Sequence, residues 1–260
     1  MKSAVDPGNY AHSNQPVLEV SGLSFQYPDQ LLVLQKVDLK VSMGERIGVI
    51  GPNGAGKTTF FMLVCGLLKP VAGKVRVFDK PVVPRDFRPE VGMVFQNPDD
   101  QLFCPSVLDD VAFGPRNLGL SEDEVNARVR EALEVVGVSD LCHRQPHHLS
   151  GGEKRLVAIA GVLAMHPKLV IHDEPTSNLD IRYRRRLICF IQSSQEAMLI
   201  ASHDLEFILE VCHRVILMDN GCVIAEGNPK EIMGNNELME AHGLERPHSL
   251  IPHAELHHRR

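Results

Sequence analysis

The feature that most constrains the fold of this chain is a glycine-rich run ending in lysine and threonine. It fits the pattern Gly-x-x-x-x-Gly-Lys-Ser/Thr and lies between an apolar run (47–50) and a helix-like segment (59–64). Glycine lets successive backbone N–H groups turn toward phosphate oxygens, and a following helix adds partial positive charge. The pattern predicts a strand, a phosphate loop and a helix in a parallel α/β sheet. The residues expected to bind the triphosphate are Gly51, Pro52, Asn53, Gly54, Ala55, Gly56, Lys57, Thr58 and Thr59.

Two residues of this loop have individual roles. Lys57 is expected to reach the β and γ phosphates, and Thr58 is expected to ligate Mg²⁺. Kinases, GTPases and transport ATPases all share such a loop. Its presence alone therefore does not separate these classes, and the rest of the chain has to do so.

A second element joins an apolar run (169–171) to two acidic residues, Asp173 and Glu174. The carboxyl end of such a strand lies beside the phosphate loop of a parallel sheet, so Asp173 is predicted to hold Mg²⁺ through water. Glu174 is the candidate general base that polarises an attacking water. His172 interrupts the apolar run, and we interpret it as a hydrogen-bonded structural histidine; the alternative is that it tunes Glu174.

The order of elements over about residues 16–230 resembles the ATP-binding-cassette (ABC) ATPases. The run 149–154 is similar to the family's signature sequence, with Glu153 where Gln is commoner. Ser150 and Glu153 also fit a capping box, and a capped helix end is itself an anion site, so both interpretations can hold. The resemblance implies that ATP held by another chain is contacted in trans by Ser150, Gly151, Gly152 and Glu153.

Five further positions match the family one by one. Gln96 corresponds to the glutamine loop, which contacts Mg²⁺ or the attacking water, and His203 resembles the switch histidine that contacts the γ-phosphate. Tyr27 occupies the place of the aromatic residue that stacks on adenine. Asn178 and Asp180 stand in the D-loop, which crosses the dimer interface, although a small apolar residue is more usual at position 178. The resemblance implies catalytic roles for Glu174, His203 and Gln96, and Mg²⁺ ligation by Thr58, Gln96 and Asp173.

The resemblance also implies an α/β fold of the P-loop NTPase (RecA-like) kind. Such a fold has a parallel sheet core, an antiparallel β part near the N-terminus and an inserted α-helical subdomain. We expect a flexible extension at 1–15 and one nucleotide-binding domain at 16–230, whose helical insertion covers about 97–164. A C-terminal helical segment and a His-rich tail are expected at 231–260. The histidines of that tail are irregularly spaced among prolines, which favours a solvated tail over a metal site.

Composition bounds the class of ABC protein. Among 260 residues, no apolar run approaches the ~20 residues that cross a bilayer. A pore would therefore come from other chains, and the polar segment 1–16 contains no secretory signal. The formal net charge of -6 argues against nucleic acid as a partner. Six scattered cysteines fit reduced, buried thiols in a cytosolic protein.

Segments of the insertion point to a subfamily. The runs 95–103 and 110–120 are similar to the ATPase component of energy-coupling-factor (ECF) importers, as are 147–154, 158–165 and 237–245. They look most like the subgroup serving cobalt and nickel importers, in which the ATPase typically forms a homodimer; a heterodimer with a similar ATPase stays open. In that family, a transmembrane coupling protein docks beside the glutamine loop, and a separate membrane protein binds the substrate. The residues expected to line the docking groove are Gln101, Leu102 and Phe103, of which Leu102 and Phe103 could instead belong to the core of the insertion.

The function implied is ATP hydrolysis at the cytoplasmic face of a membrane, with ATP and Mg²⁺. Head-to-tail dimer closure on MgATP would drive uptake of a micronutrient, with cobalt or nickel ion as the expected cargo and vitamin uptake as an alternative. A soluble ABC ATPase outside transport is the rival, but the two cassettes or long coiled coils of such proteins are absent from this sequence. A kinase or GTPase would leave the run 149–154 and His203 unexplained.

Overall fold

The structure is a computed structural model that describes residues 16–29, 31–177 and 179–251. Its strands are β1 (Pro16–Gln26), β2 (Leu32–Ser42), β3 (Arg46–Ile50), β4 (Ala72–Val77), β5 (Lys80–Pro81), β6 (Val91–Val94), β7 (Leu169–Asp173), β8 (Ala197–Ala201), β9 (Arg214–Asp219) and β10 (Cys222–Gly227). Its α-helices are α1 (Lys57–Val64), α2 (Val107–Asn117), α3 (Glu122–Val135), α4 (Gly151–Leu163), α5 (Ile181–Ser193), α6 (Leu205–Val211), α7 (Pro229–Gly234) and α8 (Asn236–Ala241). Single 3₁₀ turns are η1 (Pro98–Asp100), η2 (Ser139–Leu141), η3 (Pro146–His148) and η4 (His248–Leu250).

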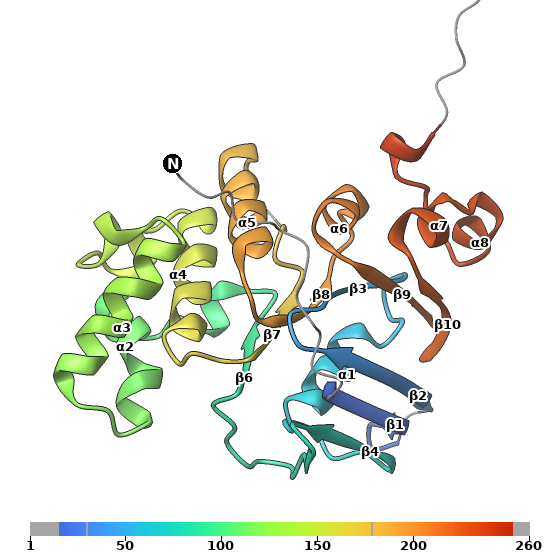
Figure 1. Cartoon of the computed structure of the whole chain (residues 1–260), viewed down its shortest axis with the longest axis horizontal. Helices are drawn as coiled ribbons and strands as arrows, with labels where there is room; N and C mark the ends of the chain where they lie inside the picture. The colour runs from blue at the N-terminus through green and yellow to red at the C-terminus, as the bar shows by residue number, and fades with distance from the viewer. Residues whose placement is uncertain (1–15, 30, 178, 252–260) are drawn as a thin grey trace, which may run out of the picture.

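The strands form two sheets (Figure 1). One has the order β10-β9-β3-β8-β7-β6 and is parallel except for β10, which pairs antiparallel with β9 at the edge. The other has the order β2-β1-β4-β5 and is antiparallel. The parallel core, the antiparallel part near the N-terminus and the helical insertion confirm the predicted fold class.

Two apolar clusters cover the two faces of the parallel sheet. Every residue of β7 and β8 is buried, as expected for parallel strands covered on both sides. On one face, Phe60 and Phe61 of α1 pack in a cluster with β1, β2 and β4. On the other face, the cluster joins α4, α5 and α6 to the sheet. The phosphate loop and the acidic residues after β7 are therefore carried by a rigid, close-packed scaffold.

The helical insertion packs on α4 at one end of the molecule (Figure 1). Ser121 and Glu124 form a capping box at the start of α3, and Gly137 takes a left-handed φ of 73° after its end. The apolar face of α3 is buried at Val125, Val129, Ala132 and Leu133.

The C-terminal helices lie at the other end of the molecule, against β9 and β10 (Figure 1). Met233 of α7 and Met239 of α8 are fully buried and anchor this segment. Within the described ranges, no helix is both long enough and apolar enough to span a bilayer.

All six cysteines are unpaired. Cys212 is buried, whereas Cys189 is exposed on α5, so the prediction of buried thiols is wrong for Cys189. Burial raises the pKa of the Cys65 thiol to about 12.

Candidate functional site

The phosphate loop joins β3 to α1 and depends on glycine at both ends. Gly56, the N-cap of α1, has a left-handed φ of 99°. Gly51 has φ 151°, and a Cβ there would lie 2.0 Å from the carbonyl oxygen of Met218. A side chain at either position would therefore distort the loop.

The turn between β9 and β10 is hydrogen-bonded to the phosphate loop. Gly221 N–H donates to Ala55 O (3.2 Å), and Gln35 N–H donates to Gly221 O (2.9 Å). Gly221 also has a left-handed φ of 76°, and a Cβ there would lie 2.2 Å from Val33 O. Three distant segments thus meet at the nucleotide loop.

Lys57 is folded back onto the loop that carries it. Its Nζ donates to Gly51 O (2.7 Å) and to Pro52 O (3.0 Å). Burial lowers the pKa of the Lys57 ammonium, and the nearby carboxylates of Glu174 and Asp173 oppose this shift. A buried ammonium held only by carbonyl oxygens is well suited to exchange them for the charged oxygens of a phosphate.

Thr58 and Asp173 lie within hydrogen-bond distance, although they come from α1 and β7. Thr58 Oγ1 donates to Asp173 Oδ2 (2.7 Å). Burial raises the pKa of the Asp173 carboxyl, and the Thr58 hydrogen bond and the Lys57 charge oppose this shift. A hydroxyl and a carboxylate are hard oxygen donors of the kind that Mg²⁺ prefers, so this pair fits the predicted metal.

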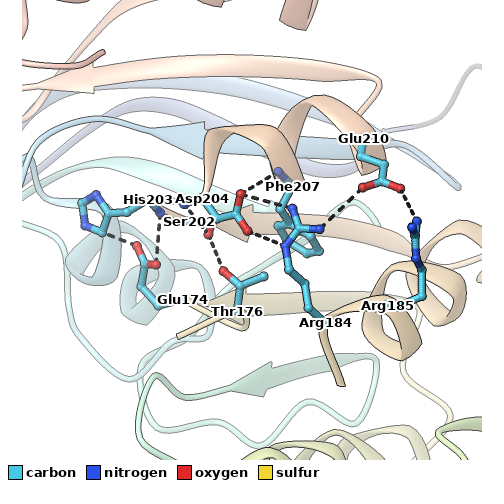
Figure 2. A network of polar contacts seen from close by, with 9 residues as sticks. All are labelled: Glu174, Thr176, Arg184, Arg185, Ser202, His203, Asp204, Phe207 and Glu210. Carbon is cyan, nitrogen blue, oxygen red and sulfur yellow. Dashed lines mark hydrogen bonds and ion pairs between the residues drawn. The ribbon is translucent and has the colours of Figure 1, made fainter. Parts of the chain in front are cut away.

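Glu174 and His203 form a second pair (Figure 2). Glu174 Oε2 accepts from the backbone N–H of His203 (3.1 Å), and Glu174 Oε1 lies 3.4 Å from His203 Nε2. Oε1 has no hydrogen-bond partner in the described part of the chain. The side chain of Glu174 is only 8% exposed and that of His203 is 48% exposed. A buried carboxylate with one oxygen free of hydrogen bonds has the arrangement of a general base.

The backbone of Glu174 is strained. Its φ of 50° is left-handed, a conformation that a residue with a long side chain rarely adopts. Glu174 N–H donates to Ala201 O (2.9 Å) of β8, which holds the residue in this conformation. Such strain is concentrated at functional sites, and no sequence pattern announced it.

One cavity of about 230 Å³ gathers most of the predicted site residues. Sequence reasoning missed Val33, a residue of β2 that no motif marks out. Gly51, Pro52 and Tyr27 are not among the lining residues. Tyr27 lies nearby, with its hydroxyl 3.4 Å from Thr59 Oγ1 and its ring edge-on to Phe25. The lining residues are Val33, Asn53, Gly54, Ala55, Gly56, Lys57, Thr58, Thr59, Gln96, Asp173, Glu174 and His203.

The signature-like segment begins α4, away from this cavity. Ser150 and Glu153 form a capping box, which confirms the structural interpretation of these residues. Ser150 and Gly151 are exposed and do not line the chain's own cavity. Gly152 is buried, and a Cβ there would lie 2.5 Å from the ring of Tyr183, so glycine is needed for close packing. The proposed contact with ATP on another chain stays a prediction.

Of the two D-loop residues, Asn178 lies outside the described residues. Asp180 caps α5, since its Oδ1 accepts from the backbone N–H groups of Arg182 (2.9 Å) and Tyr183 (3.0 Å). This cap fixes the direction in which α5 leaves the site. A role at a dimer interface stays a prediction.

His172 does not fit the expectation of a hydrogen-bonded histidine. It is fully buried, and neither ring nitrogen has a hydrogen-bond partner among the described residues. Its ring packs edge-on to Phe190, with centroids 6.4 Å apart. The face of β7 that carries it is covered by apolar side chains, so no donor or acceptor reaches the imidazole. Burial, and to a lesser extent the Arg155 charge, lowers the pKa of His172 to about 3 and keeps the ring neutral.

A second, apolar cavity of about 490 Å³ lies beside the glutamine loop. Gln101, Leu102 and Phe103 all line it. Phe103 is 66% exposed and meets Phe113 edge-on at 4.9 Å, so it is not core of the insertion, whereas Leu102 is partly buried against that core. Large apolar side chains gathered around an open cavity are typical of a binding surface.

Two side chains, Gln101 and Arg155, tie the backbone of residues 95–96 to α4. Gln101 Oε1 accepts from Phe95 N–H (3.2 Å), and its Nε2 donates to Ala158 O (3.3 Å). Arg155 of α4 donates to the carbonyl oxygens of Phe95 and Gln96. The glutamine loop is therefore attached to α4 through hydrogen bonds to the loop's backbone groups.

Comparisons with known proteins agree with this geometry. The sequence model of the ABC transporter family matches residues 34–177. A Synechocystis sp. protein described as an ABC transporter ATP-binding protein is 54% identical over 235 residues, which cover 90% of this chain and 83% of the relative. The energy-coupling factor transporter ATP-binding protein EcfA of Methanothermobacter thermautotrophicus is 49% identical and is covered over 77% of its length by 89% of this chain. The solved structure of cbiO1 from Clostridium perfringens, part of the ABC transporter complex cbiONQ, matches with a TM-score of 0.76 and 36% identity, over 87% of this chain and 94% of that one.

Proposed function

Because the chain belongs to the ABC transporter family and is an ATPase of the ECF type, we propose that it powers the import of a cobalt or nickel ion. Similarity to EcfA proteins and to cbiO1 of the cbiONQ complex supports the ECF type. The cargo proposal rests on the resemblance of 95–103 and 110–120 to ATPases of cobalt and nickel importers. In such importers the substrate is bound by a separate membrane protein, so the cargo depends on that partner and not on this chain alone.

The observation that supports the proposal best is that one short segment, residues 96–103, lines both cavities. Gln96 lines the phosphate cavity, and Gln101 to Phe103 line the apolar cavity. A shift of this segment at the apolar cavity is therefore felt at the ATP site, and the reverse. This is the connection that a transport ATPase needs.

In the proposed mechanism, the loop binds the triphosphate of ATP. Lys57 exchanges its bonds to two loop carbonyls for phosphate oxygens, and the backbone N–H groups at the start of α1 face the same anion. Thr58, Asp173 and Gln96 would hold Mg²⁺, which when bound neutralises charge on the phosphate oxygens. The Thr58–Asp173 pair supports this ligand set.

Glu174 and His203 are proposed to carry out the hydrolytic step. Oε1 of Glu174, which has no hydrogen-bond partner among the described residues, takes the position of general base and polarises the attacking water. His203, half exposed at the edge of the cavity, contacts the γ-phosphate as charge moves. Tyr27 is proposed to stack on adenine, since it lies beside Thr59 at the loop.

The complete site is proposed to need a second copy of the chain. Ser150 and Gly151, at the N-terminal end of α4, are exposed, yet they lie outside their own chain's cavity. In a head-to-tail homodimer, or a heterodimer with a similar ATPase, these residues and Glu153 meet the γ-phosphate held by the partner. Asn178 and Asp180 would lie at the same interface. Closure of the dimer then excludes water from both sites.

The apolar cavity is proposed to receive helices of a transmembrane coupling protein. Phe87, Phe103 and Phe113 are each about half exposed or more at its rim, which suits helices that carry apolar anchors. The chain would then work at the cytoplasmic face of the cell membrane, next to the coupling protein and the membrane protein that binds the substrate.

The variant Glu174→Gln tests the catalytic assignment. It should bind ATP with unchanged affinity and lose nearly all steady-state hydrolysis, because the amide cannot take a proton from water. Glu131→Gln, at an exposed carboxylate of α3, is the matched control. Normal hydrolysis by Glu174→Gln would remove Glu174 from the mechanism.

Mixing two inactive chains tests the shared site. Chains defective at Lys57 and chains defective at Ser150 should regain part of the activity when combined, because each mixed dimer contains one intact site. No recovery in proven mixed dimers would contradict the shared site.

An uptake assay tests the cargo. Cells with the complete importer should accumulate radiolabelled Co²⁺ or Ni²⁺ only when the ATPase chains hydrolyse ATP. Energised uptake of a vitamin instead would replace the proposed cargo.

A further inference from the structure

The segment after Glu174 and the segment that carries His203 are tied together at two points outside the ATP cavity (Figure 2). At the first, Thr176 Oγ1 and Ser202 Oγ lie 2.9 Å apart. At the second, Arg184 of α5 reaches Asp204. The proposed roles of Glu174 and His203 do not use either contact.

Arg184 holds Asp204 with two nitrogens on one edge of its guanidinium group, and its third nitrogen, Nη1, lies 3.8 Å from Glu210 Oε2. Arg184 Nε donates to Asp204 Oδ2 (2.7 Å), and the terminal nitrogen Nη2 lies 3.3 Å from Oδ1. The two side chains are 27% and 29% exposed. The guanidinium also lies over the ring of Phe207, 5.9 Å from its centroid. The charge-assisted bond to Asp204 raises the pKa of Arg184. A two-point pair against an aromatic ring fixes direction as well as distance.

Asp204 in turn organises the backbone of residues 202–207, which we call the switch segment because it carries His203. Its Oδ1 accepts from Phe207 N–H (2.9 Å) and so caps α6. Its own N–H donates to Ser202 Oγ (3.1 Å). His203 lies between these two residues, and its N–H donates to Glu174 Oε2 (3.1 Å). A displacement of Asp204 must therefore move His203 relative to Glu174.

The other end of the contact is fixed by α5. Arg184 N–H donates to Asp180 O (2.9 Å) in the first turn of the helix, and Asp180 caps that turn. The distance from Asp180 to Arg184 is thus set by helical geometry. Arg184 consequently connects the residues that follow Glu174 to the backbone of the switch histidine.

We propose that Arg184 is a positioning residue for ATP hydrolysis, which holds His203 in register with Glu174 through the two-point contact with Asp204. This inference rests on the proposed function of Glu174 and His203. In this proposal α5 acts as a rigid connection, so a displacement of Asp180 also displaces His203.

The neighbouring Arg185 offers a matched control. It is 71% exposed, and its ion pair is with Glu210 on α6 (3.3 Å), a carboxylate that Arg184 also approaches through Nη1 (3.8 Å). Arg184→Met and Arg185→Met remove the same charge from adjacent positions of one helix. Both remove a charge beside Glu210, and Arg184→Met in addition removes the two-point contact with Asp204.

Arg184→Met should lower kcat by about 10-fold, because small misplacements of catalytic groups cost one to two orders of magnitude. ATP affinity should stay within about 2-fold, since Arg184 does not line the cavity. Arg184→Lys, which keeps one charged bond to Asp204, should recover part of the loss. Arg185→Met should hydrolyse ATP as the unmodified chain does. If Arg184→Met does not fold, Arg184→Lys and Arg184→Gln carry the same comparison.

A double variant distinguishes positioning of His203 from a merely structural role of Arg184. On a His203→Ala background, measured in single turnover, Arg184→Met should change the rate by less than about 2-fold, because the residue it positions is gone. Equal losses on both backgrounds, or a normal kcat for Arg184→Met while Glu174→Gln is inactive, would overturn the proposal. If Glu174→Gln itself stays active, the proposed function fails instead.

Discussion

Replacing His172 by leucine should stabilise the protein. The imidazole is fully buried, and both of its nitrogens lack hydrogen-bond partners within the described residues. Burying polar atoms without partners costs about 1–3 kcal/mol, whereas leucine fills a similar volume with apolar atoms. The variant His172→Leu should therefore raise the free energy of unfolding at pH 7 by about 1–3 kcal/mol.

The same substitution should weaken the loss of stability in acid. Burial lowers the pKa of His172 from 6.5 to about 3, so below pH 6.5 the unfolded chain takes up a proton that the folded chain refuses. The free energy of unfolding then falls as the pH falls from 6.5 toward 3, by about 1.4 kcal/mol per pH unit. Between pH 7 and pH 5, this residue alone costs about 2 kcal/mol.

Urea unfolding followed by circular dichroism at pH 7 and pH 5, without nucleotide, measures both effects. The acid-induced loss should be about 2 kcal/mol smaller in His172→Leu than in the unmodified chain. His143→Leu, at an exposed histidine, serves as the control and should leave the loss unchanged. An acid-induced loss of equal size in His172→Leu and the unmodified chain would refute the reasoning.

Three further outcomes are expected. Gly152→Ala should destabilise the protein by about 1–3 kcal/mol, because the new Cβ overlaps the ring of Tyr183, and adding Tyr183→Ala should recover part of the loss in thermal unfolding; an additive double variant would contradict this. Iodoacetamide at pH 8 should label Cys189 and spare Cys65, whose pKa is raised to about 12 by burial, as checked by peptide mass spectrometry; equal labelling would show that the Cys65 site opens. Thr58→Val should raise the Mg²⁺ concentration needed for half-maximal ATP hydrolysis. Chelation by EDTA should abolish hydrolysis by the unmodified chain and by the variant. An unchanged Mg²⁺ dependence would remove Thr58 from the ligand set.

The parts of the site that could be predicted are those whose chemistry requires particular residue types. Glycines in the phosphate loop, the acidic pair at the end of β7 and the capping box at Ser150 each follow from local geometry. The placement of Gln96 and His203 in the same cavity depended on the family resemblance, because an isolated glutamine or histidine has no pattern of its own.

The remainder depends on contacts between distant segments. The strained φ of Glu174 is imposed by its bond to Ala201 on β8, and the contact between Arg184 and Asp204 joins two helices that are separate in the sequence. His172 was misinterpreted because a polar residue in a strand normally has a partner. The apolar cover supplied by other elements decides otherwise, and one sequence position does not reveal it.

The turn at Gly221 has a consequence for how the protein is made. The nucleotide loop rests on this turn through Ala55, and β3, which leads into the loop, pairs with β8 and β9. At about 5–20 residues per second, the ribosome adds Gly221 roughly 8 to 30 seconds after Ala55. During that interval the nascent chain lacks the strands and the turn that shape its nucleotide loop. ATP therefore cannot assist the early steps of folding, and nucleotide binding through this loop begins only after Gly221 has been added.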